Sequence, residues 1–208
     1  MVIILNNRLA VSDEKITERE LNARRFVRKA AAEGAVLLKN DRTLPLGKSI
    51  KKIALFGAGA GQTVRGGTGS GDVNVRSYVT VREGLSDAGY EIVTDRLLKR
   101  YDCDVSAAKA LFKSHIQQQA ADGVKNALIE MMHHPFTAPE FICPESFEGY
   151  EADAAIYVLS RISGEGADRK AVPSDYMLGK TELRDIKRIA SFYDKFVLVL
   201  NIAAPIDM

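Results

Sequence analysis

The chain has 208 residues, 46% of them hydrophobic, and a formal net charge of +2. This length allows one large domain or two small ones with a substantial hydrophobic core. The balanced charge, with no dense basic run, argues against a nucleic-acid-binding surface. No stretch approaches the roughly 18 apolar residues of a membrane-spanning helix, and the apolar residues 1–5 are too few for a secretion signal.

Residues 1–34 are predicted to be a helical lead-in to the rest of the chain, with the helix itself over residues 12–34. Ser12 or Asp13 can cap its start, and its apolar residues recur at helical spacing along one face. Gly34 is well placed to end it. The apolar run at 35–39 then predicts a short strand.

The next segment predicts a βαβ unit. Residues 53–56 are a fully apolar strand, followed by the glycine-rich sequence GAGAG at 57–61. A helix is expected at 79–88 and a third strand at 90–94. The order strand, glycine loop, helix, strand implies that the two strands pair in parallel.

The second half of the chain continues the alternation. Residues 95–132 have helical patterning, as two helices broken near Asp122 and Gly123, and 133–150 form a long connection. Strands are expected at 154–159 and 196–200, with a helix at 181–192. We therefore predict a three-layer α/β/α sandwich with a mostly parallel sheet, in one domain over 1–208. Because a parallel sheet must be covered, a chain that stops just after a strand is expected to be incomplete at its C-terminal end.

One loop combines a carboxylate with two glycines. Residues 163–169 read SGEGADR and directly follow a buried strand. In open α/β sheets, ligands sit outside the carboxyl ends of the strands, where this loop should lie. Glu165 is therefore a candidate catalytic carboxylate. The alternative is a solvated loop glutamate, with Asp168 and Arg169 as a surface pair.

The two glycine clusters do not match a nucleotide-binding motif. GAGAG at 57–61 lacks the spacing of the dinucleotide fingerprint, and no Gly-Lys-Ser/Thr follows it. Residues 66–72, GGTGSGD, form a loop that can bring backbone and hydroxyl groups close to a ligand, or one that is simply a flexible surface loop.

No metal site or cofactor is predicted. His115, His133 and His134 do not have the spacing of a zinc site, and no paired CxxC occurs. Cys103 and Cys143 are far apart in the sequence, so we expect reduced thiols in a cytoplasmic protein, with a single disulfide between them as the alternative.

Four segments, taken in order, resemble the α/β sandwich domain of glycoside hydrolase family 3. They are AEGAVLLKN at 32–40 with LPL at 44–46, GGTGSG at 66–71, SRISGEGADR at 160–169 and NIAAPI at 201–206. The stretch 102–150 matches no motif of that family.

The resemblance implies a β-glucosidase-type hydrolase that retains anomeric configuration and acts on β-linked glycosides or oligosaccharides. A (β/α)8 barrel domain supplies an Asp nucleophile, and the sandwich domain supplies the general acid/base, which falls on Glu165. Asp168 and Arg169 are then supporting residues. The aglycone side of the cleft is bordered by the glycine-rich loop, at Gly67, Thr68, Gly69 and Ser70.

The chain departs from the family in lacking a barrel and a nucleophile. We therefore expect it to be inactive alone, with the barrel located before or after it in a longer protein. The sequence leaves open a non-catalytic carbohydrate-binding or interaction domain, and a nucleotide-binding α/β domain.

Overall fold

The computed structural model describes residues 15–67, 71, 73, 75–121, 123–164 and 169–208. The chain divides into two compact units, Met1–Arg42 and Thr43–Met208. Among the described helices, none combines the length and apolar character needed to cross a bilayer. The elements are α1 (Glu18–Glu33), β1 (Lys52–Phe56), η1 (Ala58–Ala60), α2 (Val81–Asp87), β2 (Glu91–Ile92), α3 (Asp95–Ala121), α4 (Val124–His133), β3 (Ala154–Arg161), α5 (Lys180–Phe192) and β4 (Phe196–Ile202).

The first unit contains α1, which begins later than predicted. Thr17 is its N-cap, and Glu20 completes a capping box: the Glu20 amide donates to Thr17 Oγ1 at 3.3 Å, and the Thr17 amide donates to Glu20 Oε2 at 2.8 Å. Each side chain thus satisfies an amide that the first turn leaves open. The expected caps, Ser12 and Asp13, are therefore wrong, and both lie outside the described residues. Gly34 ends the helix as predicted.

The strand predicted at 35–39 is also wrong. These residues adopt no regular structure, and Val36, Leu37 and Leu38 are exposed. A strand is stable only when its backbone groups pair with a neighbour and its side chains pack on a face. No such pairing occurs for this run within the described part of the chain.

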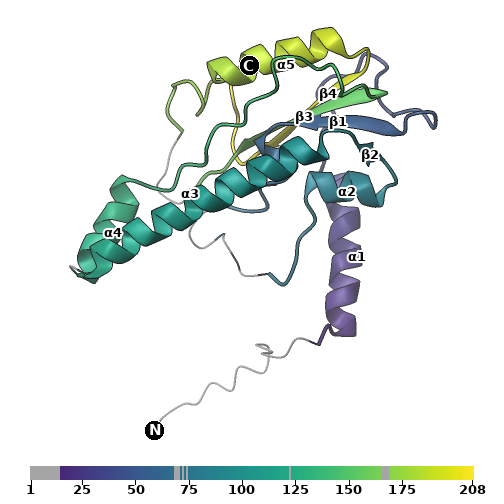
Figure 1. Ribbon diagram of the computed structural model, residues 1–208. Helices are drawn as coiled ribbons and strands as arrows, with labels where there is room; N and C mark the ends of the chain where they lie inside the picture. Colours follow the sequence, from purple (N-terminus) through teal and green to yellow (C-terminus); the bar gives the residue numbers. More distant parts are fainter. Residues whose placement is uncertain (1–14, 68–70, 72, 74, 122, 165–168) are drawn as a thin grey trace. The chain divides into compact units, whose positions relative to one another are not determined.

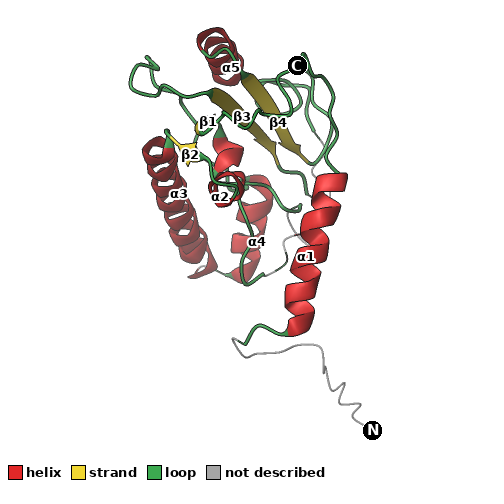
Figure 2. Ribbon diagram, turned by 90° about the vertical axis from the view of Figure 1, so that its right-hand side faces the viewer, coloured by secondary structure: helices red, strands yellow, loops and turns green. Residues whose placement is uncertain are grey.

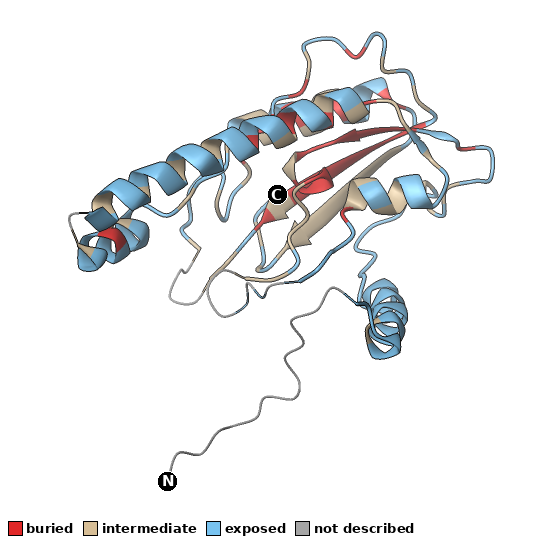
Figure 3. Cartoon of the chain, turned by 60° about the horizontal axis from the view of Figure 1, so that its bottom comes forward, coloured by how far each residue is buried: buried red, intermediate tan, exposed pale blue. Residues whose placement is uncertain are grey.

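The second unit is built on a parallel sheet in the order β2-β1-β3-β4. Ile53 pairs in register with Ala154, and Ala155 with Phe196. The apolar runs of β1 and β3 form the centre of the core, while the residues of β4 are only half-buried (Figure 3). The predicted α/β fold with a parallel sheet is confirmed.

Helices lie on both faces of the sheet, which makes three layers (Figures 1 and 2). α5 covers one face and buries Ile189, whereas α2 and α3 lie on the other, where α3 buries Leu98, Tyr101 and Val105. The helices predicted near 79–88 and 181–192 are confirmed. So is the pair predicted at 95–132, because α3 ends at residue 121 and α4 begins at residue 124.

The third predicted strand is confirmed only in part, because β2 is two residues long. Thr94, which is fully buried, explains its early end. Its Oγ1 accepts a hydrogen bond from the Leu55 amide at 2.8 Å and donates to the Leu55 carbonyl at 2.6 Å. One hydroxyl thus replaces the backbone partners that a longer strand would offer, and α3 begins at the next residue.

Candidate functional site at the carboxyl edge of the sheet

The carboxyl ends of β1, β3 and β4 meet at one edge because the strands are parallel. β1 leads into a glycine turn that packs directly on β3. Gly57 has φ +90°, and a Cβ there would lie 2.4 Å from the Val158 carbonyl oxygen. A Cβ on Gly59 would lie 2.6 Å from the Val158 side chain. Only glycine fits this close approach, so the turn is held against the end of the central strand.

Asp102 on α3 holds the far side of this turn. Its carboxylate accepts hydrogen bonds from Gln62 Nε2 and from Arg82 Nη1, both at 2.8 Å. A Cβ on Gly61 would lie 2.7 Å from Asp102 Oδ1. One carboxylate therefore joins the turn after β1 to helices α2 and α3.

The chain then enters the glycine-rich loop, which is fixed at two points. Thr63 Oγ1 donates to the Gly59 carbonyl at 2.7 Å and accepts from the Val81 amide at 2.9 Å. The amide of Val64 donates to Asn201 Oδ1 at 2.5 Å, and Asn201 Nδ2 donates back to the Val64 carbonyl at 2.9 Å. These bonds tie the start of the loop to its own turn, to α2 and to the end of β4.

The glycine-rich loop reaches the loop that follows β3. A Cβ built on Gly67 would lie only 2.7 Å from the carbonyl oxygen of Ser163, so the two backbones are in close contact. The sequence predicted the two loops as separate candidate sites, and the fold places their backbones in contact. Thr68, Gly69 and Ser70, predicted to border the aglycone, lie outside the described residues.

Glu165 and Asp168 also lie outside the described residues, but both flanks of their segment are described. Arg169 Nη2 donates to the Ile162 carbonyl at 2.5 Å, which links the two flanks directly. Arg169 Nη1 donates to Asp175 Oδ1 at 2.7 Å, and the Lys170 amide donates to Asp175 Oδ2 at 2.9 Å. The hydrogen bond from Arg169 is the main reason that the pKa of Asp175 is below its usual value. Arg169, predicted as a supporting residue, thus fixes the ends of the segment that carries Glu165.

A largely buried ion pair lies at the end of β3, where this loop begins. Arg161 binds Glu182 through two parallel hydrogen bonds of 2.7 and 2.6 Å, and the side chains are 8% and 15% exposed. Arg161 Nε also donates to the Asp175 carbonyl at 3.0 Å, and the Gly179 amide donates to Glu182 Oε2 at 2.7 Å. Such two-pronged pairing fixes geometry as well as charge.

The sequence predicted no role for Arg161, Asp175 or Glu182, although Arg161 lies within the segment that resembles the acid/base loop. A signal was present, since Arg161 is a charged residue at the end of an otherwise buried apolar run. A charge in that position requires a partner. Its identity could not be read from the sequence, because Glu182 lies 21 residues away.

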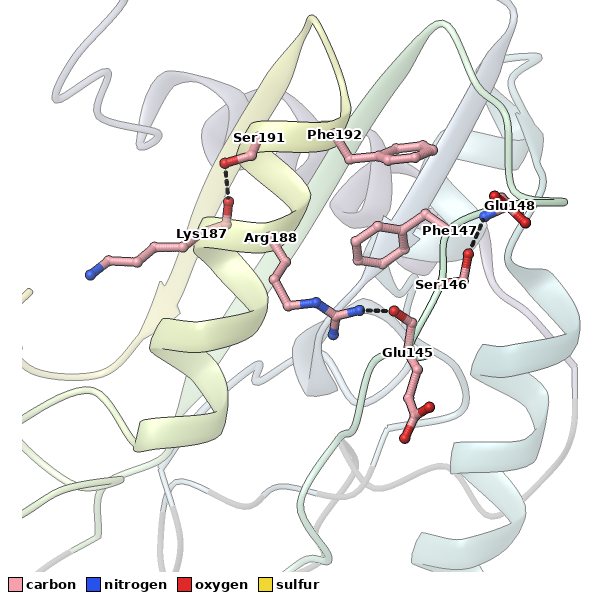
Figure 4. Close-up of a pocket in the computed structure, with 8 residues that line it drawn as sticks. All are labelled: Glu145, Ser146, Phe147, Glu148, Lys187, Arg188, Ser191 and Phe192. Carbon is pink, nitrogen blue, oxygen red and sulfur yellow. Dashed lines mark hydrogen bonds between the residues drawn. The ribbon is translucent and has the colours of Figure 1, made fainter.

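A hollow of about 500 Å³ lies elsewhere, between the last turns of α5 and the connection that precedes β3 (Figure 4). The rings of Phe147 and Phe192 lie 5.3 Å apart there, and Arg188 lies 5.0 Å from the centroid of Phe147. Arg188 Nη2 donates to the carbonyls of Pro144, at 2.9 Å, and Glu145. This hollow lies where α5 ends and leads into β4, toward the amino ends of the strands, and contains no residue predicted to be functional.

Comparison with known proteins identifies the family. The family model "Glycosyl hydrolase family 3 C-terminal domain" matches residues 35–208. Beta-glucosidase A of Butyrivibrio fibrisolvens is 31% identical over 201 residues, which cover 86% of this chain and 22% of that protein. A beta-glucosidase of Ruminococcus albus is 29% identical, over 91% of this chain and 19% of that protein. The chain therefore spans about a fifth of the length of these curated relatives.

Two solved structures indicate the same family. Beta-glucosidase 3B from Thermotoga neapolitana, in complex with α-D-glucose, matches 92% of this chain and 26% of its own, with a TM-score of 0.66 and 29% identity. The beta-glucosidase from Paenibacillus barengoltzii matches 88% of this chain and 19% of its own, with a TM-score of 0.64 and 27% identity. The resemblance inferred from the four motifs is confirmed. The chain belongs to glycosyl hydrolase family 3, and it matches the C-terminal domain of that family.

Proposed function

We propose that this chain supplies the general acid/base of a retaining β-glycosidase of the β-glucosidase type, and that Glu165 is that residue. The proposal rests mainly on one observation: the backbone of Gly67 lies against Ser163, two residues before Glu165. Two loops that could contact a ligand thus share the carboxyl edge of one parallel sheet, where α/β proteins bind ligands.

The chemistry requires a second carboxylate from outside this chain. In retaining hydrolysis a nucleophile attacks the anomeric carbon while an acid protonates the departing oxygen, and the two carboxyl groups lie about 5 to 5.5 Å apart. The carboxylate that remains then acts as a base and takes a proton from the water that releases the sugar. The nucleophile is an Asp on a (β/α)8 barrel domain, so this chain alone does not turn over a glycoside.

The loop residues have distinct roles in this proposal. Gly67 and its neighbours Thr68, Gly69 and Ser70 border the aglycone, because the glycine-rich loop lies beside the loop of the proton donor. Asp168 and Arg169 hold that loop in place. The hydrogen bonds of Arg169 to Ile162 and Asp175 support this role, because they tie together the residues on either side of Glu165.

The test is Glu165→Gln in the protein that contains both this chain and the barrel. Glutamine cannot donate the proton, so kcat/KM for a β-glucoside with a poor leaving group should fall by about 10² to 10⁴. An activated aryl glucoside needs less protonation and should lose less. Azide should restore turnover of Glu165→Ala by replacing water as the nucleophile in the second step.

Glu148→Gln is the matched control, because it makes the same chemical change beside the hollow toward the amino ends of the strands. It should leave the kinetics unchanged. Unchanged kcat/KM in Glu165→Gln on the poor substrate would overturn the proposal.

A further inference from the structure

Asn201 makes a contact that neither the motifs nor the proposed chemistry explains. Its amide lies near the end of β4 and forms two hydrogen bonds with one residue, Val64, which is 137 positions away. The oxygen accepts from the Val64 amide at 2.5 Å, and the nitrogen donates to the Val64 carbonyl at 2.9 Å. A side-chain amide can do both at once because it carries one acceptor and two donors.

The backbone of Asn201 also lies at the carboxyl edge of the sheet. Asn201 pairs in register with Ser160 of β3, and two residues later the Ala203 amide donates to the Arg161 carbonyl at 3.1 Å. Asn201 thus stands where the ends of β3 and β4 meet the start of the glycine-rich loop. Three residues beyond Val64, Gly67 lies against Ser163.

We infer that Asn201 is a positioning residue that fixes the glycine-rich loop against the loop of Glu165, and so sets the width of the aglycone side of the site. The inference rests on the proposed function, because the space between the two loops borders an aglycone only if Glu165 is the proton donor. Thr63 fixes the start of the loop to the turn after β1 and to α2. Asn201 instead bonds the start of the loop to β4. In this role Asn201 acts through its bonds to Val64 and not by contact with the sugar.

The first experiment needs no catalysis and uses the 208-residue chain. Asn201→Leu keeps the size of the side chain but removes both hydrogen bonds. Amide hydrogen exchange at Val64 should become at least about tenfold faster, the expected loss for one or two net hydrogen bonds. Exchange at Leu55, in the buried strand β1, should not change.

Asn22→Leu is the matched control, since Asn22 lies on the exposed helix α1, where it accepts one hydrogen bond from Arg25. It should leave Val64 exchange as in the wild type. A wild-type exchange rate at Val64 in Asn201→Leu would overturn the inference. So would equal acceleration at Leu55, because that result indicates a general loss of stability.

The second experiment uses the barrel-containing protein and compares two constants. Asn201→Leu should change KM for β-glucosides with extended aglycones by about tenfold, while the inhibition constant of free glucose, which has no aglycone, changes less than about twofold. A general loss of stability moves both constants. Equal changes in both, or a change in neither, would overturn the inference.

The two proposals can fail separately. If Glu165→Gln abolishes turnover while Asn201→Leu leaves both constants unchanged, only the positioning role of Asn201 is overturned. If Glu165→Gln has no effect, the proposed function fails whatever the exchange at Val64 shows.

Discussion

Arginine–carboxylate pairs of α5 occur toward both ends of the parallel strands, yet they differ in construction: Glu182 pairs with Arg161 of β3, whereas Asp185 pairs with Arg184 and Arg188 of α5 itself. At the carboxyl edge, Glu182 in the first turn of α5 binds Arg161, the last residue of β3 before the loop of Glu165. Toward the amino edge, where α5 ends and leads into β4, Arg188 donates to the Pro144 carbonyl of the connection before β3. Asp185, one turn after Glu182 on α5, accepts from the Cys143 amide of the same connection at 3.0 Å.

The difference shows which feature marks a site. Charged pairs occur at both edges, so a buried ion pair alone does not identify function. Close backbone approach distinguishes the carboxyl edge, where the chain at Gly57 and Gly67 leaves no room for a side chain. The amino edge instead packs aromatic rings, as expected of a structural contact.

The largest effect is expected from Glu182→Ala, which removes the ion pair at the carboxyl edge. It leaves the Arg161 guanidinium buried without its partner, and the free energy of unfolding should fall by about 3 to 5 kcal/mol. Urea denaturation measures this loss. Limited proteolysis should show new cleavage within 162–179 and none within 139–150; cleavage in both segments would mean that the two edges are not independent.

Asp185→Ala should loosen the connection before β3, with a smaller fall in the free energy of unfolding, about 1 to 3 kcal/mol. The loss is smaller because Arg184 and Arg188, 52% and 30% exposed, can be solvated once the carboxylate is gone. Burial raises the pKa of the Cys143 thiol, so the wild-type thiol should react slowly with a disulfide reagent.

In Asp185→Ala, loosening of the connection should speed modification of Cys143, measured in a Cys103→Ser background because Cys103 is exposed. Glu182→Ala serves as the reciprocal control and should leave the Cys143 rate unchanged. If the Cys143 thiol still reacts slowly in Asp185→Ala, the role of the Asp185 carboxylate is contradicted.

The smallest expected effect is a pH dependence at Asp153, which precedes β3. Asp153 Oδ2 accepts from the amides of Lys51 and Lys52 at 2.7 and 2.8 Å, and these bonds, first that of Lys52, lower its pKa. A lowered pKa means that the carboxylate stabilises the fold above the usual aspartate pKa of about 3.9, and that this contribution is lost as pH falls through the folded-state value.

Asp153→Asn tests this sign. The wild type should be more stable than Asp153→Asn near pH 6, and the difference should shrink as the pH falls below 4. Urea denaturation at several pH values gives both curves, and a difference that grows toward acid would contradict the assignment.

Much of the fold could be read from the sequence because its signals are local. The apolar runs that became β1, β3 and β4, and the periodic segments that became α2 and α5, are each contained in one short window. The failures have physical causes. Residues 35–39 have strand-forming side chains but no pairing partner among the residues that the structure describes. β2 is short because the Thr94 hydroxyl takes the place of backbone partners.

The site was predictable only as separate loops. The glycines at 66–71 and the sequence around Glu165 are visible in the chain, and the family resemblance that they carry is confirmed. The contacts that join them, from Asn201 to Val64 and from Arg161 to Glu182, span 137 and 21 residues. Such pairings are set by the order of strands in the sheet, which local patterns do not contain.

That order has a consequence for how the domain forms. β1 pairs with β2 over only two residues, and its long neighbour β3 comes about a hundred residues later, since Ile53 pairs with Ala154. A nascent chain therefore exposes the apolar strand β1 until about a hundred further residues have been made. Pairing this distant in sequence makes folding slow and leaves the unfinished chain prone to aggregation. The glycine turn after β1, although made early, acquires its final shape only when β3 arrives.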